Sequence, residues 1–522
     1  MKIFFILITI LLFAACGVNL ADIAPSGFGV VPTHEEEPEI DENEDYYILH
    51  EPAENPVPLL QSDNILRLSM RQPITLNPLL NEDVTVARIL RLIFEPLILL
   101  DENFRPQGHL AEVELASDFA SAVLTIRADA FWSDGMPVTS DDLIFSIDTL
   151  RQAPSTAIYR QNVTNIAEIT RINSRTVQID FVQGSAYAVN MLNFPIIPQH
   201  HYVGALQATA MNPLGNGTYI FDSLIPMRSM TLTESPNTFR SRPQISEVEV
   251  LFLPNTQTEL YAFDQGRIDA IHLPLTEWVR HHSVRHINYE VFPAMYFEFI
   301  GFNFENAIFQ DLNVRQGIAH AFDANAAVNA VYLNHAVRAA SPIHPNNWAE
   351  GNVQGLSHDT GRARELLGRV NTRLVILANA DNPQRVAIAG RLAADLAAVG
   401  LQVSTEVVPY AEYFARIESG DFDLFVGGVN LSFTPGVQFF FQGGLYTTDP
   451  ELETALTLVR LAFSESAYTQ AITNFGQLFS ERLPVISLAF RHSAVITNAR
   501  VQQNNPPTPD NVFGWVNEWI IE

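Results

Sequence analysis

The sequence contains only one cysteine and one lysine among its 522 residues. A single cysteine, Cys16, excludes a disulfide bond within the chain. Only 30 Lys and Arg residues stand against 58 Asp and Glu residues, which gives a net charge of -28. Proteins that bind nucleic acids present basic surfaces to the phosphates, so we expect no nucleic-acid partner.

Motifs of the common enzyme classes are also absent. The chain has no HExxH, no G-x-S-x-G, no Walker A sequence and no G-x-G-x-x-G. The paired acids Asp141 and Asp142 follow a capping Thr139 or Ser140, where carboxylates favour the positive end of a helix dipole. The sequence therefore indicates a protein that is not an enzyme, and a surface hydrolase is the alternative that these absences disfavour.

The N-terminus has the layout of an export signal. One cation, Lys2, precedes the apolar run Ile3–Phe13 and the small residues Ala14 and Ala15. This run is too short to cross a membrane as a helix, and the order of charge, apolar run and small residues is typical of a secretory signal. We therefore predict a signal peptide over residues 1–15.

Cys16 comes directly after this signal, and the segment resembles a bacterial lipobox. In a lipobox the cysteine is lipidated and becomes the first residue of the mature protein. The sequence departs from that pattern at Phe13, where an aliphatic residue is usual. The alternative is ordinary cleavage near Ala15, which leaves a free thiol. We predict that Cys16 carries the lipid.

An acidic, proline-containing segment follows the cysteine. Residues 17–61 contain eleven acidic residues and no Lys or Arg. Such a segment repels itself and has little apolar surface to bury, so it stays extended or disordered. We predict that residues 16–61 form a lipidated tether that holds a folded body away from a membrane.

The remaining sequence reads as a globular α/β protein. Its length exceeds what one hydrophobic core supports, so we expect at least two lobes. Ile65–Met70 alternates as a strand does, and later segments alternate between helices and strands. Helices are expected after Asp311, over residues 359–368 and up to Gly400. This βαβαβ order favours an α/β lobe with a largely parallel sheet.

Five segments carry a resemblance to a known family. In order along the chain they are "TLNPLL" with "RLIFEPLILLDENFRPQGHLAE", "ADAFWSDGMPVTSDDLIFSI", "GNGTYIF", "FIGFNFENAIFQDLNVRQGIAHAFD" and "ESGDFDLFVGG". Together they resemble the family 5 extracellular solute-binding proteins, the peptide, dipeptide and nickel binding components of ABC importers. Each segment also has a structural reading. Trp132 to Gly135, for example, would form a tight turn with an anchoring aromatic ring.

The resemblance implies a two-lobed clamp of the periplasmic-binding-protein type, type II, in the large cluster with an extra subdomain. Residues 64–85, 200–295 and 487–522 would form the core of lobe I, and residues 86–199 a subdomain inserted into it. Residues 296–486 would form lobe II. The ligand cleft would lie between the lobes, and a ligand that contacts both would favour the closed state.

The resemblance also implies where a ligand binds on lobe II. In peptide-binding members an extended ligand pairs with a strand that here comprises Gly427, Gly428, Val429, Asn430 and Leu431. Glycine in such a strand lets a ligand backbone approach closely. Typical members continue with Trp-x-x-Asp-(Tyr/Asn)-x-x-Pro, whose Asp pairs with the α-ammonium group of the ligand.

This chain departs from that pattern. Alignment on Pro435 places Leu431 where the Asp would be, and no acidic residue lies between Asp423 and Asp449. The ligand expected at this position is therefore neutral or apolar where typical peptides present an ammonium group.

On lobe I the candidates are Gln72, Pro73 and Ile74 in the opening turn. Asn303 lies where the chain is expected to cross between lobes, near residues 299–303; a second crossing is expected near residues 485–490. Asn303 either binds the ligand or satisfies the backbone of the crossing, and both readings stay open. Trp348 either lines the cleft or packs in a loop.

Histidines raise the question of a metal, because some relatives bind nickel complexes. His281, His282 and His286 have helical spacing, and His200 and His201 are adjacent. Neither group has a companion carboxylate or cysteine at a recognised ligand spacing, so we expect surface or packing histidines, no metal and no cofactor.

These observations predict a monomeric, lipid-anchored binding protein outside the cytoplasmic membrane. It would capture oligopeptides or peptide-like solutes and deliver them to the permease and ATPase subunits of an ABC importer. The alternatives are a sensory receptor that reports a peptide to a membrane partner, and a member of the same family that binds nickel chelates or glycans.

Overall fold

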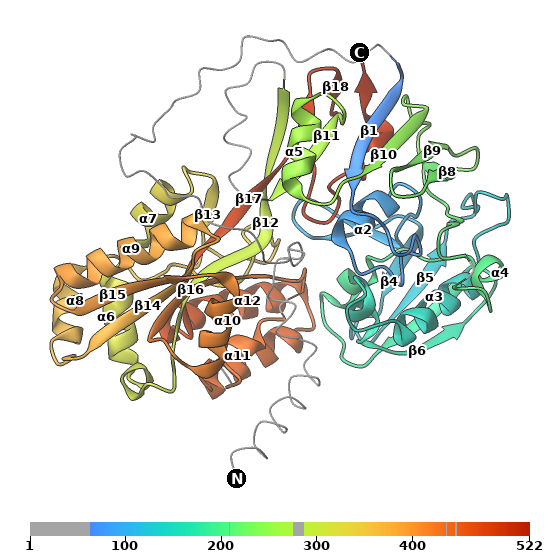
Figure 1. Ribbon diagram of the computed structural model, residues 1–522. Helices are drawn as coiled ribbons and strands as arrows, with labels where there is room; N and C mark the ends of the chain where they lie inside the picture. The colour runs from blue at the N-terminus through green and yellow to red at the C-terminus, as the bar shows by residue number, and fades with distance from the viewer. Residues whose placement is uncertain (1–62, 208, 275–286, 435, 444–445) are drawn as a thin grey trace.

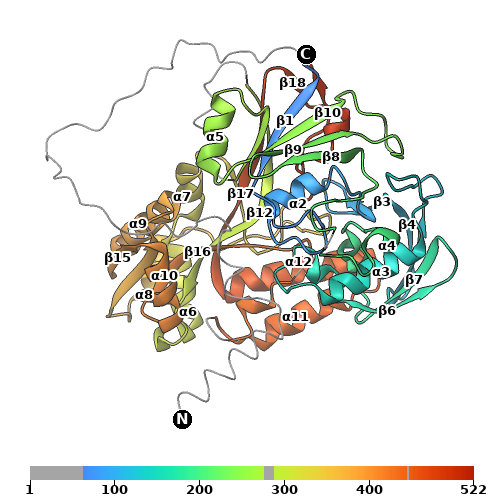
Figure 2. The ribbon, with the colours of Figure 1, turned by 45° about the vertical axis from the view of Figure 1, so that its right-hand side comes forward.

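The computed structural model describes residues 63–522, apart from residues 208, 275–286, 435 and 444–445. The predicted signal peptide, the predicted lipidation site Cys16 and the predicted tether over residues 16–61 lie outside the described residues, as do His281, His282 and His286. Figures 1 and 2 show two bodies joined by two long strands, and we refer to them as lobe I and lobe II.

Lobe I is built around two four-stranded sheets. The first sheet contains, in spatial order, β1 (Ile65–Met70), β10 (Glu247–Phe252), β9 (Ser229–Glu234) and β8 (Tyr219–Ile225). The second contains β4 (Ala111–Leu115), β5 (Ser121–Ile126), β7 (Thr176–Phe181) and β6 (Ile166–Arg171). Side chains of both sheets belong to one continuous hydrophobic core. The second sheet lies within residues 86–199, the range predicted for an inserted subdomain, and it packs directly on the first sheet.

Short elements complete lobe I. The helices are α2 (Val84–Leu90), α3 (Ser140–Gln152), α4 (Gln199–Tyr202) and α5 (Thr256–Asp264), and a small hairpin pairs β2 (Ile98–Leu100) with β3 (Pro106–Gly108). Two 3-10 helices span Arg160–Val163 and Ala188–Leu192, and near the C-terminus β18 (Val501–Gln502) pairs with β19 (Ile520–Ile521) around a 3-10 helix at Val516–Glu518.

A third sheet runs from lobe I into lobe II. Its order is β11 (Ala270–Pro274), β17 (Val485–Asn498), β12 (Ile287–Phe302), β16 (Leu424–Asn430), β14 (Arg373–Asn379) and β15 (Gln402–Val408), with β13 (Ala336–Arg338) on β17. Strands β14, β15 and β16 are parallel, but β12 pairs antiparallel with β16 and β17, and β11 and β13 pair antiparallel with β17. The prediction of a largely parallel sheet is therefore wrong, because the long strands that join the lobes make the sheet mixed.

The long strands β12 and β17 join the lobes. Their pairing shifts register between Pro293 and Phe297. Before this shift, β12 pairs with β17, and β17 pairs in turn with β11 of lobe I. After the shift, β12 pairs with β17 and also with β16 of lobe II. The chain thus passes between the lobes inside continuous strands. On β12 the crossing lies before residues 299–303, the range in which the sequence predicted it.

Helices cover both faces of the sheet in lobe II (Figure 1). They are α6 (Leu312–Ala321), α7 (Ala324–Val331), α8 (Thr360–Leu367), α9 (Pro383–Ala398), α10 (Tyr410–Ser419), α11 (Pro450–Arg460) and α12 (Glu465–Arg482), with 3-10 turns at Ala307–Gln310 and Gln438–Phe440. Side chains of α6 to α9 form one hydrophobic core with the sheet, and side chains of α10 to α12 form another.

Local sequence chemistry explains several helix ends. Asp311 caps α6 by accepting the N–H of Asn313 at 2.9 Å, and Asp359 caps α8 by accepting the N–H of Arg362 at 2.9 Å. Helix α9 ends before Gly400, whose φ of 100° is available to glycine without strain. The helices predicted at these three places are confirmed.

The predicted aromatic turn is confirmed as a structural element. Trp132 is fully buried, and Gly135 donates its N–H to the carbonyl of Trp132 at 2.9 Å with a φ of 87°. The indole N–H donates to Asp142, which also accepts from the backbone and hydroxyl of the N-cap Thr139 of α3. Asp142 therefore connects the turn to the helix, and its carboxylate has a structural use.

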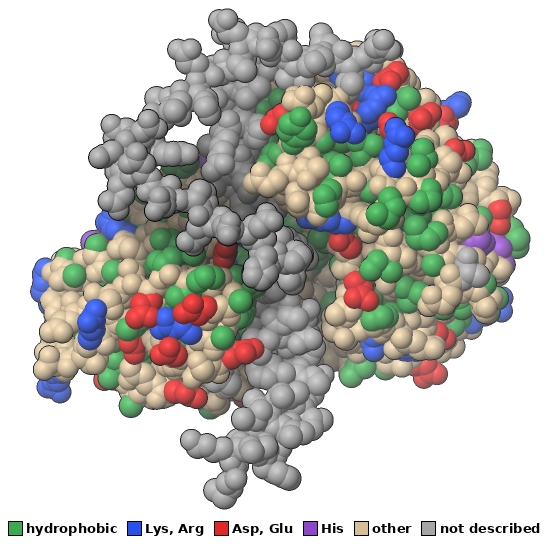
Figure 3. Space-filling view, in the orientation of Figure 1, with side chains coloured by type: hydrophobic (Ala, Val, Ile, Leu, Met, Phe, Trp, Pro, Cys, Tyr) green, Lys and Arg blue, Asp and Glu red, His purple; other side chains and the backbone are tan. Residues whose placement is uncertain are grey.

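The surface carries the charge expected from the composition. On the face in Figure 3, acidic side chains gather on lobe II and hydrophobic ones are scattered over lobe I. Among the helices of the described residues, none is long and apolar enough to cross a bilayer.

Candidate functional site

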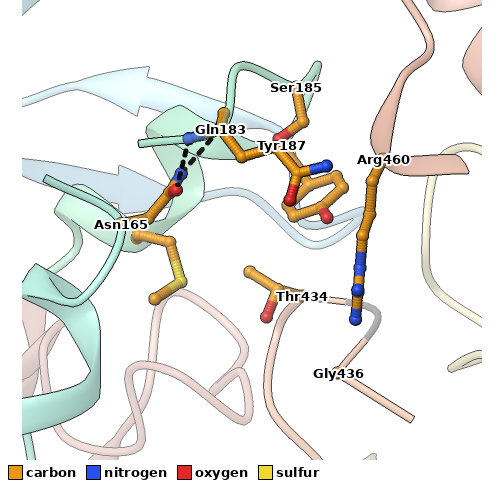
Figure 4. Close-up of a pocket in the computed structure, with 8 residues that line it drawn as sticks. Asn165, Gln183, Ser185, Tyr187, Thr434, Gly436 and Arg460 are labelled. Atoms are coloured by element: carbon orange, nitrogen blue, oxygen red, sulfur yellow. Dashed lines mark hydrogen bonds between the residues drawn. The ribbon is translucent and has the colours of Figure 1, made fainter. Parts of the chain in front are cut away.

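A cavity of about 150 Å³ lies between the inserted subdomain and lobe II (Figure 4). The subdomain side is formed by Asn165, Gln183, Ser185, Tyr187 and Met191, and the lobe II side by Thr434, Gly436 and Arg460. Ligand sites occur preferentially at interfaces between domains. This cavity, with walls from both lobes, is therefore the candidate site.

The subdomain wall is fixed by backbone contacts. Asn165 precedes β6 and Gln183 follows β7, and the antiparallel pairing brings these two ends together. The side-chain amide of Asn165 donates to the carbonyl of Gln183 at 2.9 Å and accepts its N–H at 3.0 Å. Ser185 and Tyr187 then lead into the 3-10 helix Ala188–Leu192. Two polar side chains are thus held at the edge of the cavity.

Arg460 supplies the charge of the site. It is the last residue of α11 and extends beside the ring of Tyr187 toward Thr434 and Gly436 (Figure 4). Its Nη2 donates to the side-chain oxygen of Gln438 at 2.8 Å. Burial raises the pKa of Tyr187 above its usual value, although Arg460 and a hydrogen bond with Ser185 act in the opposite direction. Of the eight described residues that line the cavity, Arg460 is the only charged one.

A second cavity of about 20 Å³ lies close by and is bordered by Phe104, Leu431, Phe433 and Thr434 among others. It has room for about one water molecule. Thr434 borders both cavities, so the chain after β16 separates them.

Phe104 fills the apolar side of this region and connects the two lobes. It lies in the turn between β2 and β3, whose Ile98 and Leu100 pack in the core of lobe I. Its own ring is 1% exposed and packs in lobe II, with ring centroids 4.7 Å from His344 and 5.2 Å from Phe433. The φ of Phe104 is 61°, a conformation that costs about 1–2 kcal/mol in a residue with a side chain. Contacts across the lobes therefore offset local strain.

Backbone and stacking contacts surround this ring. The N–H of Trp348 donates to the carbonyl of Asn103 at 3.0 Å, and the guanidinium of Arg105 lies 4.2 Å from the centre of the Trp348 ring. The side chain of Asn346 donates to the carbonyl of Glu102 at 3.1 Å. Trp348 thus packs at the contact between the lobes.

His344, which touches Phe104, predicts a loss of stability in acid. Its Nδ1 accepts the N–H of Asn346 at 3.1 Å and its Nε2 faces the carbonyl of Pro293 at 3.3 Å, so the ring fits its site as a neutral imidazole protonated on Nε2. Burial lowers the pKa of His344 to about 4, and hydrogen bonds to the backbone of Pro293 and Ala294 oppose this only in part. Protonation of Nδ1 would place its new N–H against the backbone N–H of Asn346, and neither group could then accept the other's hydrogen bond.

Below pH 6.5 the unfolded chain binds a proton at this histidine that the folded chain does not bind until about pH 4. The free energy of unfolding should therefore fall by about 3 kcal/mol from this group as the pH drops from 7 to 4. Thermal unfolding of the wild type and of His344→Gln across this range measures the contribution. The variant should lose less stability in acid, and equal pH slopes for the two proteins would show that His344 does not carry the effect.

The residues predicted from sequence on lobe II lie together on β16. Residues Tyr296 to Phe299 of β12 pair antiparallel with this strand. A side chain at Gly428 would collide with Tyr296, Arg385 and Glu298, so this glycine makes room for buried side chains of the protein itself. Asn430 is exposed, whereas Leu431 is 8% exposed and borders the second cavity.

The residues predicted on lobe I lie apart from β16. Gln72 and Ile74 are exposed and Pro73 is buried, in the turn that follows β1. Leu76, just beyond, donates its N–H to the carbonyl of Ala210 at 2.6 Å. In the described part of the chain no backbone hydrogen bond joins this turn to β16.

Asn303 has a structural use at the other end of β16. Its side-chain amide donates to the carbonyls of Gly420 and Phe422, at 3.0 and 2.8 Å, in the turn that leads into the strand. Eight residues of extended chain separate Asp423 from Leu431, which is about 26 Å. Of the two readings left open by the sequence, the contacts favour satisfaction of the backbone.

A buried charged cluster adjoins Gly428. Glu298 is fully buried, and its two oxygens lie 3.1 Å from Nε of Arg385 and 3.3 Å from Nη1 of Arg491. The Arg491 guanidinium also lies 3.9 Å from the centre of the Tyr296 ring. Burial lowers the pKa of Arg385, but the negative charge of Glu298 dominates and holds that pKa above its usual value. Two buried cations thus share one carboxylate.

The adjacent histidines His200 and His201 have ordinary partners. His200 lies 2.8 Å from a carboxylate oxygen of Asp134, and His201 lies 3.0 Å from the carbonyl of Asn212. Within the described residues no three His, Cys, Asp or Glu side chains are grouped so that they could hold a metal ion.

Sequence reasoning missed Arg460, Tyr187 and Phe104. Arg460 looks like an ordinary basic residue in the last turn of a helix. The only available signal was the uncharged stretch from Leu424 to Thr448, which contains no Asp, Glu, Lys or Arg. It pointed to lobe II but not to the subdomain that completes the cavity.

Comparison with known proteins identifies the family. Residues 105–449 match the family described as bacterial extracellular solute-binding proteins, family 5, middle. A Brucella ovis relative named as an ABC transporter peptide-binding protein is 23% identical over 340 residues, covering 61% of this chain and 64% of the relative. The oligopeptide-binding protein AppA of Bacillus subtilis is 21% identical over 411 residues, covering 72% of this chain and 75% of AppA.

Solved structures share the fold. The substrate-binding protein CtaP of Listeria monocytogenes superposes with a TM-score of 0.78 at 16% identity, covering 88% of this chain and 99% of CtaP. AppA of Bacillus subtilis in complex with a nonapeptide gives a TM-score of 0.65 at 17% identity, with 88% and 99% covered. The predicted two-lobed fold is confirmed. The chain belongs to the family 5 bacterial extracellular solute-binding proteins, which are binding proteins and not enzymes.

Proposed function

We propose that this protein is the substrate-binding lipoprotein of an ABC importer and that it captures oligopeptides or peptide-like solutes between its lobes. The observation that carries the proposal is the cavity with polar walls from the subdomain and from lobe II. Membership in the family and the names of the relatives support the solute class. The loaded protein would act as a monomer and dock on a membrane permease, whose ATPase subunits drive transport.

Extended ligands would also reach the strand positions expected from the sequence. Gln72, Ile74 and Asn430 are exposed, so these residues are accessible to a ligand that crosses between the lobes. We retain these positions, with Pro73, Gly427 to Val429 and Leu431 beneath them, as candidate contacts of a longer peptide. We expect the protein to need no metal and no cofactor.

Ligand-induced stabilisation tests the proposal. Purified protein lacking residues 1–61 should unfold at a higher temperature in the presence of a random peptide library, because binding to the folded state alone stabilises it by mass action. No shift with peptides, but a shift with glycans or nickel chelates, would replace the ligand class. If peptides, glycans and nickel chelates all leave the unfolding temperature unchanged, the proposed binding function is wrong.

The anchor is a separate part of the proposal, and it predicts a change of location. In the native host the Cys16→Ala variant should move from the membrane fraction to the soluble fraction, because Ala cannot be lipidated and the acidic tether has no affinity for an anionic surface. Immunoblots of the fractions measure the change. A variant that stays with the membrane would show that another contact retains the protein.

A further inference from the structure

Phe104 is a lobe I residue that fills part of the lobe II core. Among the described residues, every other buried member of this core lies at Met295 or later in the chain. Phe104 is carried instead by the turn between β2 and β3, and Ile98 and Leu100 of β2 pack in the core of lobe I. Lobe I thus supplies one aromatic ring to a core whose other buried residues belong to lobe II or to the strands that join the lobes.

The turn holds this ring in a fixed position. The carboxylate of Asp101 accepts the N–H groups of Asn103 and Arg105, both at 2.9 Å. The N–H of Phe104 donates to the carbonyl of Asp101 at 2.9 Å, and its carbonyl accepts the side-chain amide of Asn190 at 2.9 Å. At a φ of 61° glycine is the residue without strain. A phenylalanine kept in this conformation indicates that the contacts of its ring have a use.

The space that receives the ring is largely apolar, and we call it the Phe104 pocket. The ring centroid lies 4.7 Å from that of His344 and 5.2 Å from that of Phe433. Apolar side chains also border the small second cavity beside the ring, namely Met295, Ile343, Leu431 and Val437. Because that cavity of about 20 Å³ holds about one water molecule, the ring fills almost all of the pocket. A much smaller residue at position 104 would leave a space the size of a phenyl group.

The Phe104 pocket adjoins the candidate site. Thr434 borders both the second cavity and the cavity of about 150 Å³ between the lobes. The larger cavity has mostly polar walls, whereas the Phe104 pocket is largely apolar. A solute whose end lies in the polar cavity would therefore find an apolar pocket beside it if the ring were absent. With the ring in place, this pocket is closed to the solute.

We propose that Phe104 determines specificity by occupying, with the protein's own ring, the pocket that would otherwise bind an apolar side chain of the solute. The inference rests on the proposed function, because it concerns the solute bound at the interlobe cavity. It adds a specificity-determining residue outside the polar lining of that cavity. It also names a ligand class, namely peptides or peptide-like solutes that present a small or polar residue, and no aromatic one, beside Thr434.

The test compares two tetrapeptide libraries with free termini. Both are drawn from Gly, Ala, Ser and Thr, and in one of them each peptide carries a single Phe at a random position. The full-length protein in detergent is titrated with each library, and the concentration that gives half-maximal thermal stabilisation is measured. The wild type should bind the Phe library no more than about 3-fold more tightly than the other, because a phenyl group left in water gains nothing.

Substitutions at position 104 should create a preference for Phe. Phe104→Gly should bind the Phe library about 10- to 100-fold more tightly than the other library, as expected for burial of a phenyl ring. Phe104→Ala should show the same preference. The readout is the ratio of the two concentrations within one variant, since weaker contact between the lobes lowers the affinity for both libraries alike.

Two further variants serve as controls. Phe104→Leu refills most of the pocket and should restore the wild-type ratio. Phe194→Ala removes an equally buried ring from the core of lobe I and should leave the ratio unchanged, because its cavity lies away from the site.

The outcomes separate the two proposals. If neither library stabilises the wild type or the variants, the proposed peptide function fails, and the inference falls with it. If the wild type binds peptides but Phe104→Gly and Phe104→Ala show no preference for Phe, the function stands and the inference is overturned. The inference is also overturned if the wild type prefers the Phe library as strongly as Phe104→Gly does, or if Phe194→Ala acquires the same preference.

Discussion

Replacing Glu298 with glutamine is expected to destabilise lobe II more than any other single neutral substitution of a charged residue. Glu298 is fully buried and is the shared counterion of Arg385 and Arg491. Glutamine keeps the shape of the side chain but leaves two buried guanidinium groups without compensation. Breaking a buried ion pair in this way costs about 3–5 kcal/mol. For a lobe of this size the midpoint of thermal unfolding should fall by roughly 10 °C.

A matched control distinguishes buried from exposed charge. Glu365→Gln removes the partner of Arg362 on α8. The Arg362 Nη1 and Glu365 Oε2 atoms lie 2.6 Å apart, and both side chains are largely exposed. The substitution should therefore cost no more than about 0.5 kcal/mol of stability. A second variant replaces Glu298, Arg385 and Arg491 together by methionine and should recover much of the loss, because it leaves no unpaired charge. If Glu298→Gln and Glu365→Gln have equal midpoints, the cluster is hydrated and our account of it is wrong.

Local chemistry predicted the parts of the fold that depend on few residues. The capping aspartates at 311 and 359 and the glycine after α9 end their helices through contacts within a few residues, so the sequence pattern contains the information. The passage between lobes was harder to place. Strand β12 continues through it with register shifts between Pro293 and Phe297 and between Glu298 and Phe299, and such shifts depend on the partner strand.

The site was less predictable because it depends on pairs that are distant in sequence. Glu298 and Arg385 are 87 residues apart, and Asn190 holds the carbonyl of Phe104 from 86 residues away. The uncharged stretch after β16 did mark the lobe II side of the site. Nothing in the sequence shows that Tyr187 of the subdomain faces Arg460, since only the packing of the two lobes creates that contact.

Removing the ring of Phe104 is expected to uncouple the two lobes. The ring is anchored by a lobe I hairpin but buried in the core of lobe II, so it contributes free energy only when the lobes are in contact. Truncating a buried phenylalanine to alanine costs about 3–5 kcal/mol. A change of 3 kcal/mol corresponds to a factor of roughly 150 in the equilibrium between joined and separated lobes. Calorimetry of Phe104→Ala should resolve two unfolding transitions where the wild type shows more overlap, and small-angle scattering should give a larger radius of gyration.

Phe194 provides the comparison, because it is fully buried in the core of lobe I alone. Phe194→Ala should lower the transition of lobe I without increasing the separation of the lobes. Phe104→Gly adds a second comparison, since glycine adopts the φ of 61° without strain; it should uncouple the lobes as alanine does while retaining the turn.

If Phe104→Ala keeps the wild-type radius of gyration and lowers a single transition as Phe194→Ala does, the ring is an ordinary core residue. If it separates the lobes, the hydrogen bond of Trp348 with Asn103 and the stacking of Arg105 are too weak to hold them alone. Peptide affinity should then fall by at most this factor, because a solute held by both walls must first bring the lobes together.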